Sequence, residues 1–127
     1  KIGETLIVGD VISLREAIRK IIDNGLKFSP PDKSVVVTLQ KTSQPGWIEI
    51  LVRDFGIGID EIDKMILFRR FGRVRNEETA GIPGSGLGLY IAKNFIEKHN
   101  GSITISSKLD EGSTFALRLP ITQRDIK

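Results

Sequence analysis

The spacing of apolar residues changes at two adjacent prolines, Pro30 and Pro31, and this change limits what the chain can fold into. Before the prolines, apolar side chains recur every three or four residues from Asp10 onward, which predicts a long helix. Proline lacks the helical amide donor and its ring clashes with the preceding turn, so this helix must end before Pro30. After the prolines, residues 35–42 and 47–54 alternate apolar and polar side chains around a Gln-Pro-Gly turn, which predicts a β-hairpin.

The rest of the chain continues this mixture of helical and strand-like patterns. A polar stretch over residues 72–84 has no periodicity and reads as a mobile loop. The other expected elements are a strand over 4–9, a short helix near 60–67, a long helix over 85–98, and two strands over 102–107 and 113–119. This order predicts an α/β protein in which one mixed sheet is covered on one face by helices.

Composition and charge restrict the class of protein. A chain of 127 residues falls within the range of one compact domain. Its net charge of +3, with both signs interspersed, is not typical of a nucleic-acid-binding surface. It contains no cysteine and no apolar run of the roughly 20 residues that a membrane span requires. We therefore expect residues 1–127 to be a single cytoplasmic domain of a longer protein, without nucleic acid and without direct membrane contact.

The sequence DFGIG at 54–58 places an acid at the end of the second hairpin strand. The carboxylate of Asp54 can accept a hydrogen bond from the exocyclic amine of adenine. Gly56 and Gly58 would let the backbone approach a flat base closely. By itself, the motif is also typical of a glycine turn capped by aspartate.

The sequence GSGLGL at 84–89 marks the beginning of the second long helix. Free amides at a helix N-terminus and the positive end of the helix dipole favour phosphate oxygens, although Gly84, Gly86 and Gly88 can also serve only as hinges. The motif is not a dinucleotide-binding fingerprint, because Leu89 occupies the last glycine position and a polar loop precedes it. The chain also lacks the Gly-Lys-Ser/Thr ending of a P-loop.

Polar side chains form a stripe along the first long helix. The amide oxygen of Asn24 is a ligand that a hard cation such as Mg²⁺ accepts, and Lys27, one turn later, can pair with a phosphate. The alternative for the lysines of this stripe is an ordinary solvated helix face.

Together, and in this order, these motifs resemble the GHKL superfamily of ATP-binding domains, and within it the histidine kinase branch. The resemblance covers nearly the whole chain. It includes an N box over 10–29, a G1 box at 54–58, an F box at 67–73, a G2 box at 84–89, and further signatures at 96–101 and 111–115. The F box is the feature that discriminates the histidine kinase branch. The resemblance implies a Bergerat-type two-layer α/β sandwich with a flexible ATP lid over about 72–84.

The resemblance also implies roles for individual residues. Asn24 would hold Mg²⁺, Asp54 would read adenine, and the phenylalanines Phe68 and Phe71 would anchor the lid. Arg73 resembles the F-box arginine, which can reach phosphate or partner helices, or be structural. The implied nucleotide-binding residues are Asn24, Lys27, Asp54, Gly56, Gly58, Arg73, Gly84, Gly86, Leu87, Gly88 and Thr114. Because Asp54 ends a strand, its replacement by alanine is expected to remove adenine binding and to leave the fold intact.

The implied activity is that of a protein-histidine kinase that uses ATP and Mg²⁺. The acceptor histidine would lie on an upstream dimerisation and histidine phosphotransfer domain, and the downstream partner would be a response regulator. The only histidine of this chain, His99, ends the second long helix and is expected to cap it. The alternatives are a GHKL ATPase and a pseudokinase module that binds nucleotide without catalysis.

The chain departs from the family pattern four residues before Asn24, where Lys20 stands. Histidine kinases usually carry asparagine at this position, and ATP-hydrolysing members carry a glutamate base. An ammonium group has no free lone pair to accept a proton from water, so Lys20 argues against activated hydrolysis. Two alternatives remain open: Lys20 contacts phosphate, or it projects into solvent with metal binding weakened. Gly25 replaces the usual alanine, at a cost of about 1 kcal/mol of helix stability.

Overall fold

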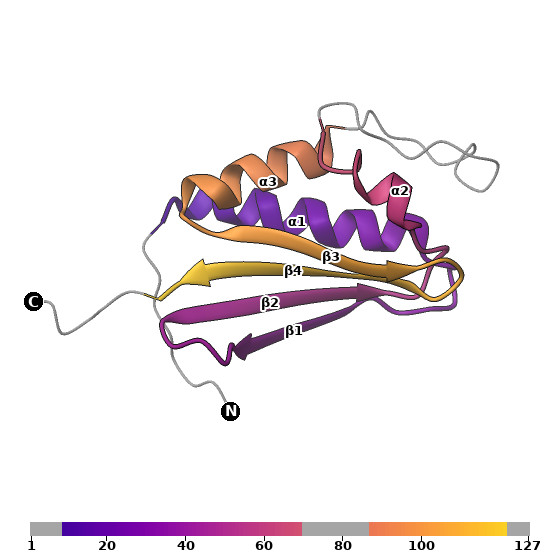
Figure 1. Ribbon diagram of the computed structural model, residues 1–127, viewed down its shortest axis with the longest axis horizontal. Helices are drawn as coiled ribbons and strands as arrows, with labels where there is room; N and C mark the ends of the chain where they lie inside the picture. Colours follow the sequence, from indigo (N-terminus) through magenta and orange to yellow (C-terminus); the bar gives the residue numbers. More distant parts are fainter. Residues whose placement is uncertain (1–8, 70–86, 122–127) are drawn as a thin grey trace, which may run out of the picture.

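The structure is a computed structural model that describes residues 9–69 and 87–121. Its elements form two layers, with a sheet of four strands on one side and the helices together on the other (Figure 1). The elements are α1 (Val11–Phe28), β1 (Val36–Lys41), β2 (Trp47–Asp54), α2 (Glu61–Lys64), α3 (Gly88–Lys98), β3 (Ser102–Lys108) and β4 (Gly112–Pro120). The expected two-layer α/β sandwich is confirmed.

The strand order in the sheet is β1-β2-β4-β3, and the three pairings are all antiparallel. The predicted hairpin is present, with β1 and β2 paired around the turn. The mixed sheet predicted from the sequence therefore appears, within the described part of the chain, as an antiparallel one. The strand expected over 4–9 lies outside the described residues apart from Gly9. The β4 strand occupies the centre beside β2, so residues more than fifty positions apart become neighbours at the end of β2.

Helix α1 begins and ends where local chemistry predicts. The Oδ1 atom of Asp10 accepts hydrogen bonds from the amides of Ile12, at 3.0 Å, and Ser13, at 3.4 Å, which satisfies donors that a helix start leaves free. The helix ends at Phe28, before the two prolines.

Helix α3 is described from Gly88, and the expected helical residues 85 and 86 lie outside the described part of the chain. Its end is closed by Asn100, which has a φ of 64°, and by the amide of Gly101, which donates to the carbonyl of Ile96 at 3.0 Å. A left-handed residue after the last turn is a common way to satisfy the free carbonyls there.

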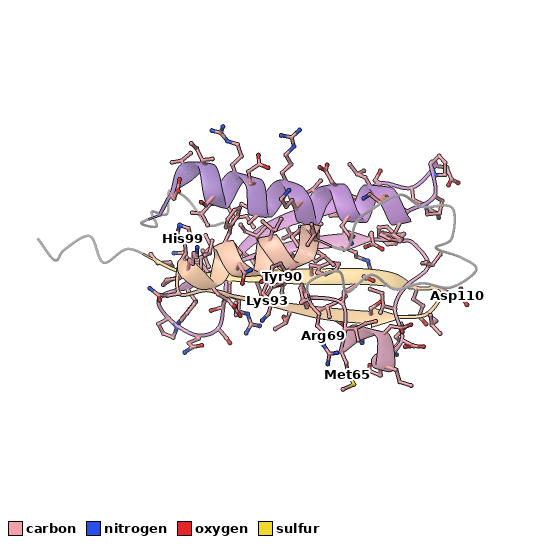
Figure 2. The ribbon with its side chains drawn as sticks, turned by 90° about the horizontal axis from the view of Figure 1, so that it is seen from above. Met65, Arg69, Tyr90, Lys93, His99 and Asp110 are labelled. Carbon is pink, nitrogen blue, oxygen red and sulfur yellow. The ribbon has the colours of Figure 1, made fainter. Side chains whose placement is uncertain are left out.

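His99 caps α3, as expected, and also connects the two long helices (Figure 2). Its Nε2 accepts a hydrogen bond from the Asp10 amide at 2.8 Å, and its Nδ1 lies 2.8 Å from the Phe95 carbonyl oxygen. Because the Asp10 amide can only donate, Nε2 must be the unprotonated nitrogen and the ring proton sits on Nδ1. Gly9 lies against the ring, where a Cβ would collide with it. The start of α1 is thereby fastened to the end of α3.

The core lies between the helices and the sheet. The two long helices and the strands β2, β3 and β4 contribute buried residues, such as Ile21 from α1, Val52 from β2, Ile96 from α3 and Phe115 from β4. Within the described ranges, neither long helix has the length and apolar character needed to cross a bilayer.

The first half of the F box is packed into this core. Leu67 is buried, and the ring of Phe68 packs edge-on against the ring of Phe115, with centroids 6.1 Å apart and an interplanar angle of 87°. Such edge-to-face pairs stabilise a core beyond their buried area. Phe68 therefore fastens the first half of the F box to the core, and its role in anchoring the lid stays a prediction, because Phe71, Arg73 and the lid expected over 72–84 lie outside the described residues.

Candidate nucleotide site

Asp54, the last residue of β2, has a buried carboxylate that the backbone holds in place. Only 4% of the residue is exposed. Its Oδ1 accepts hydrogen bonds from the amide of Gly56, at 3.1 Å, and from the amide of Ser113 on β4, at 3.2 Å. No described residue donates to Oδ2. The central position of β4 brings Ser113 to this carboxylate, although 59 positions separate the two residues in the chain.

The surroundings of Asp54 disfavour the ionised form of its carboxyl group. Burial raises the pKa of its carboxyl group, and the two backbone hydrogen bonds and the charge of Arg53 only partly oppose this shift. A buried carboxylate of raised pKa costs folding free energy in its ionised form. Such groups gather at functional sites, where they are retained for a ligand rather than for stability.

Gly56 and Gly58 are required by close backbone contacts in the protein itself. A Cβ at Gly56 would collide with the carbonyl oxygen of Phe28, the last residue of α1. Gly58 has a φ of 74°, and a Cβ there would collide with the carbonyl oxygen of Lys108 in β3. The sequence indicated these glycines for the approach of a base, and the structure adds that α1 and β3 need them too.

The segment after Asp54 is braced against the turn between β3 and β4. The carbonyl of Ile57 accepts from the Asp110 amide at 2.7 Å, and the amide of Ile59 donates to Ser107 Oγ at 2.8 Å. Ser107 Oγ also lies 2.7 Å from Ser113 Oγ, and both serines are buried. The reasoning from sequence overlooked these two serines. The sequence offered one signal for Ser107. It stands two residues after Ile105, so strand alternation places this polar side chain on the buried face of β3.

The residue of β4 that contacts Asp54 is Ser113, and Thr114, which the resemblance places near the nucleotide, lies on the other face of the strand. Successive side chains of a strand point to opposite faces, so Ser113 shares the helix-covered face with the buried Phe115. Thr114 therefore points to the open face, where its partner in the register is the exposed Arg53. A shift by one residue along a strand changes the face, and the contact of Thr114 with the nucleotide stays a prediction.

Two predicted site residues of α1, Asn24 and Lys27, lie within two positions of Gly25, which adjoins Asp54. A Cβ at Gly25 would be 3.5 Å from the Cβ of Asp54, and Asn24, the preceding residue, is half-buried. Lys27 is exposed in the last turn of α1, where a cation also interacts favourably with the helix dipole.

The start of α3 has no cap among the described residues. Leu87 occupies the N-cap position without a side-chain hydrogen bond, and Gly88 is exposed, with no atom of the described residues within 4 Å of the position of a Cβ. Unsatisfied amides at a helix start are a ready site for anions. Arg73, Gly84 and Gly86, which the sequence assigns to the same phosphate region, lie outside the described residues.

The donor set near Asn24 fits a magnesium ion that is held chiefly by a nucleotide. Residues 9–69 and 87–121 contain no cluster of three or more histidine, aspartate or glutamate side chains. Mg²⁺ commonly keeps several waters and binds substrate phosphates with only one or two protein oxygens. The half-buried amide of Asn24 can supply one such oxygen.

A two-layer sandwich with a buried, backbone-held carboxylate and an open helix start is the arrangement of a nucleotide-binding domain. Residues 9–123 match the model of the family described as histidine kinase-, DNA gyrase B-, and HSP90-like ATPase, and the chain belongs to this family.

Its relatives narrow the class to the histidine kinase branch. The chain is 40% identical over 114 residues to the sensor-like histidine kinase SenX3 of Mycolicibacterium smegmatis, covering 90% of this chain and 29% of that protein. It is 31% identical over 120 residues to the sensor protein RprX of Bacteroides fragilis, covering 94% and 23%. The solved structure of the mycobacterial sensor histidine kinase MprB superposes with a TM-score of 0.78 at 33% identity, covering 91% of this chain and 74% of that one. The resemblance to histidine kinase catalytic domains is confirmed, and the chain spans about a quarter of the curated relatives' length.

Proposed function

We propose that this chain is the catalytic domain of a sensor histidine kinase, which binds Mg-ATP and transfers its γ-phosphate to a histidine of another domain. The observation that carries the proposal is the Asp54 carboxylate, which is buried without a described cation to pair with it. Its Oδ1 is held by the amides of Gly56 and Ser113, so its Oδ2 can accept a hydrogen bond from the exocyclic amine of adenine.

The residues at the phosphate end contribute position and charge. Asn24 would offer an amide oxygen to Mg²⁺, which supplies charge neutralisation at the phosphates when it is bound with ATP. Lys27 and the free amides at Gly88 would meet phosphate oxygens. In the transfer, an imidazole nitrogen of the acceptor histidine attacks the γ-phosphorus. The bond between this phosphorus and the bridging oxygen breaks, leaving ADP and phosphohistidine.

The acceptor belongs to another domain. Both ring nitrogens of His99 are engaged, one by the Asp10 amide and the other by the Phe95 carbonyl, at the far end of α3 from its free amides. We therefore assign residues 1–127 to one domain of a longer cytoplasmic kinase. Its partners would be an upstream dimerisation and histidine phosphotransfer domain, dimeric in the whole protein, and a response regulator.

Phosphotransfer in trans tests this proposal. The chain is mixed with the dimerisation domain of its parent protein and γ-labelled ATP, and acid-labile phosphate is measured on each component. Label is expected on the dimerisation domain and not on this chain, because the acceptor histidine lies there. A folded chain that binds ATP and transfers nothing would overturn the kinase proposal.

A nucleotide-binding pseudokinase is the second candidate, and Lys20, in place of the usual asparagine, favours it. Magnesium dependence separates the two. For a kinase, ATP affinity measured by calorimetry should be several-fold higher with Mg²⁺ than with EDTA. Asn24→Ala should reduce this difference while leaving the affinity in EDTA unchanged. Equal affinities with and without Mg²⁺ in the unmodified chain would favour the pseudokinase. A GHKL ATPase would instead hydrolyse ATP steadily without any partner.

A further inference from the structure

Lys20 lies on the flank of α1 that faces α3. The buried face of α1 carries Ala17 and Gly25, and a Cβ at Gly25 would lie 3.4 Å from Val35, which precedes β1. The flank beyond Ala17 carries Lys20 and Asn24 at helical spacing, and both are half-buried. Since α1 lies between the β1 side and α3, this flank must face α3 (Figures 1 and 2).

Lys20 is also level with the start of α3. The hydrogen bond between the Asp10 amide and His99 fastens the beginning of α1 to the end of α3, so the two helices run antiparallel. Lys20 lies ten positions after Asp10, and His99 lies ten positions after Leu89. Helices rise by about 1.5 Å per residue, so both paths cover about 15 Å and end side by side. Lys20 therefore stands opposite the first turn of α3, whose first amides have no hydrogen-bond acceptor among the described residues.

The ammonium group of Lys20 has no ion pair among the described residues. The two acids within helical reach of it are Glu16 and Asp23. Both pair with Arg19, at 3.7 Å and 4.0 Å, on the exposed side of α1. A surface salt bridge, the ordinary role of a helical lysine, is thus not what holds this half-buried side chain.

We infer that Lys20 binds the phosphates of the nucleotide directly, a role that rests on the proposed ATP site. Gly25 adjoins Asp54, the proposed contact of adenine. Asn24 precedes Gly25 in α1, and Lys20 lies about 7 Å from Gly25 along the helix axis, in the direction away from Asp54. This order follows the order of base, metal and outer phosphates in ATP. An ammonium group makes charge-assisted hydrogen bonds to phosphate, so Lys20 replaces an uncharged amide with a direct ionic contact.

Nucleotide titrations of Lys20→Met test this assignment. ATP affinity should fall about tenfold, because an ionic hydrogen bond to phosphate is lost. Adenosine affinity, followed by NMR shifts, should change less than twofold, because adenosine has no phosphate. Lys20→Arg should keep ATP affinity within about threefold, since the charge and the donors remain.

Arg15→Met is the matched control. It removes the same charge from an exposed position on α1 that lies away from α3, so it should leave ATP affinity unchanged. The assignment is overturned if Lys20→Met weakens ATP no more than this control, or weakens adenosine as much as ATP. Should Lys20→Met unfold, Lys20→Ala removes the same charge with the residue that most favours a helix, and the same criteria apply. An unmodified chain that binds no ATP would instead overturn the proposed function, and Lys20 with it.

Discussion

Asp54→Asn is expected to lower ATP affinity about a hundredfold and to leave the fold at least as stable as before. The asparagine keeps an Oδ1 that can accept from the amides of Gly56 and Ser113. Its Nδ2, however, presents a donor where the carboxylate presents an acceptor, and it would face the amine donor of adenine. A lost charged hydrogen bond and an unpaired donor together correspond to roughly 3 kcal/mol, which is the hundredfold expected. Calorimetric titration with Mg-ATP measures it.

The same variant should change the dependence of stability on pH. Burial raises the pKa of Asp54 in the folded state, so the protonated carboxyl favours folding. This contribution is fully present below the unfolded pKa of about 3.9 and is lost as pH rises through the folded value. Asparagine does not titrate. Urea unfolding across this range should therefore show the unmodified chain losing stability relative to Asp54→Asn as pH rises.

The two measurements on Asp54→Asn are independent. Tight ATP binding by Asp54→Asn would falsify the role of the carboxylate in binding adenine.

Alanine is a poorer probe of this position than the sequence suggests. The sequence places Asp54 at a strand end, from which Asp54→Ala is expected to leave the fold intact. In the structure the carboxylate is buried and is the acceptor for two amides. Its removal leaves both donors unsatisfied, and each buried unsatisfied group costs about 1–3 kcal/mol. Loss of ATP binding by the alanine variant would therefore mix a local effect with a loss of stability.

Gly56→Ala is expected to destabilise the domain by about 3 kcal/mol, the upper end of what overpacking usually costs. The new Cβ would collide with the carbonyl oxygen of Phe28. Backbone at the end of α1 cannot move aside without shifting the helix on the core. The free energy of unfolding in urea measures the effect, and ATP affinity should fall as well because the Gly56 amide supports Asp54.

Gly25→Ala is the matched control, because it adds the same methyl group to α1 at a position beside Asp54. Its Cβ would meet the nearest atoms, in Val35 and Asp54, at 3.4 Å and 3.5 Å, which are ordinary contacts. Alanine favours a helix over glycine by about 1 kcal/mol, so this variant should be more stable than the unmodified chain. If both variants lose the same stability, the collision at Gly56 is not the reason for its glycine.

The elements with strong local signals agree with their predictions. Asp10 starts α1 because its side chain caps the first amides, and proline geometry ends it, both effects of neighbours in the chain. The hairpin of β1 and β2 follows from alternation around a short turn. Asp54 could be chosen as a candidate site residue because an acid between a strand and glycines is a local pattern. The short helix α2 is less extended than expected, since turns follow Lys64.

The residues that complete the site depend on contacts between distant parts of the chain. Ser113 contacts Asp54 because β4 lies beside β2 and the register of the two strands pairs these residues. No local pattern in the sequence states this register, so the sequence could not show that Ser113 rather than Thr114 faces the carboxylate. Ser107 braces the glycine segment for the same reason. The position of Lys20 opposite the start of α3 depends on the hydrogen bond of His99 to Asp10.

For the part of the chain that the structure describes, the amino-acid sequence alone therefore settled the helices and strands, their order and the family, because capping, proline geometry and apolar periodicity act between near neighbours. The tertiary structure decided which side chains share the site, why Gly56 must be glycine, and that the Asp54 carboxylate is buried and held by two backbone amides. These properties arise when strand pairing and helix packing bring distant residues within hydrogen-bonding distance and remove them from water.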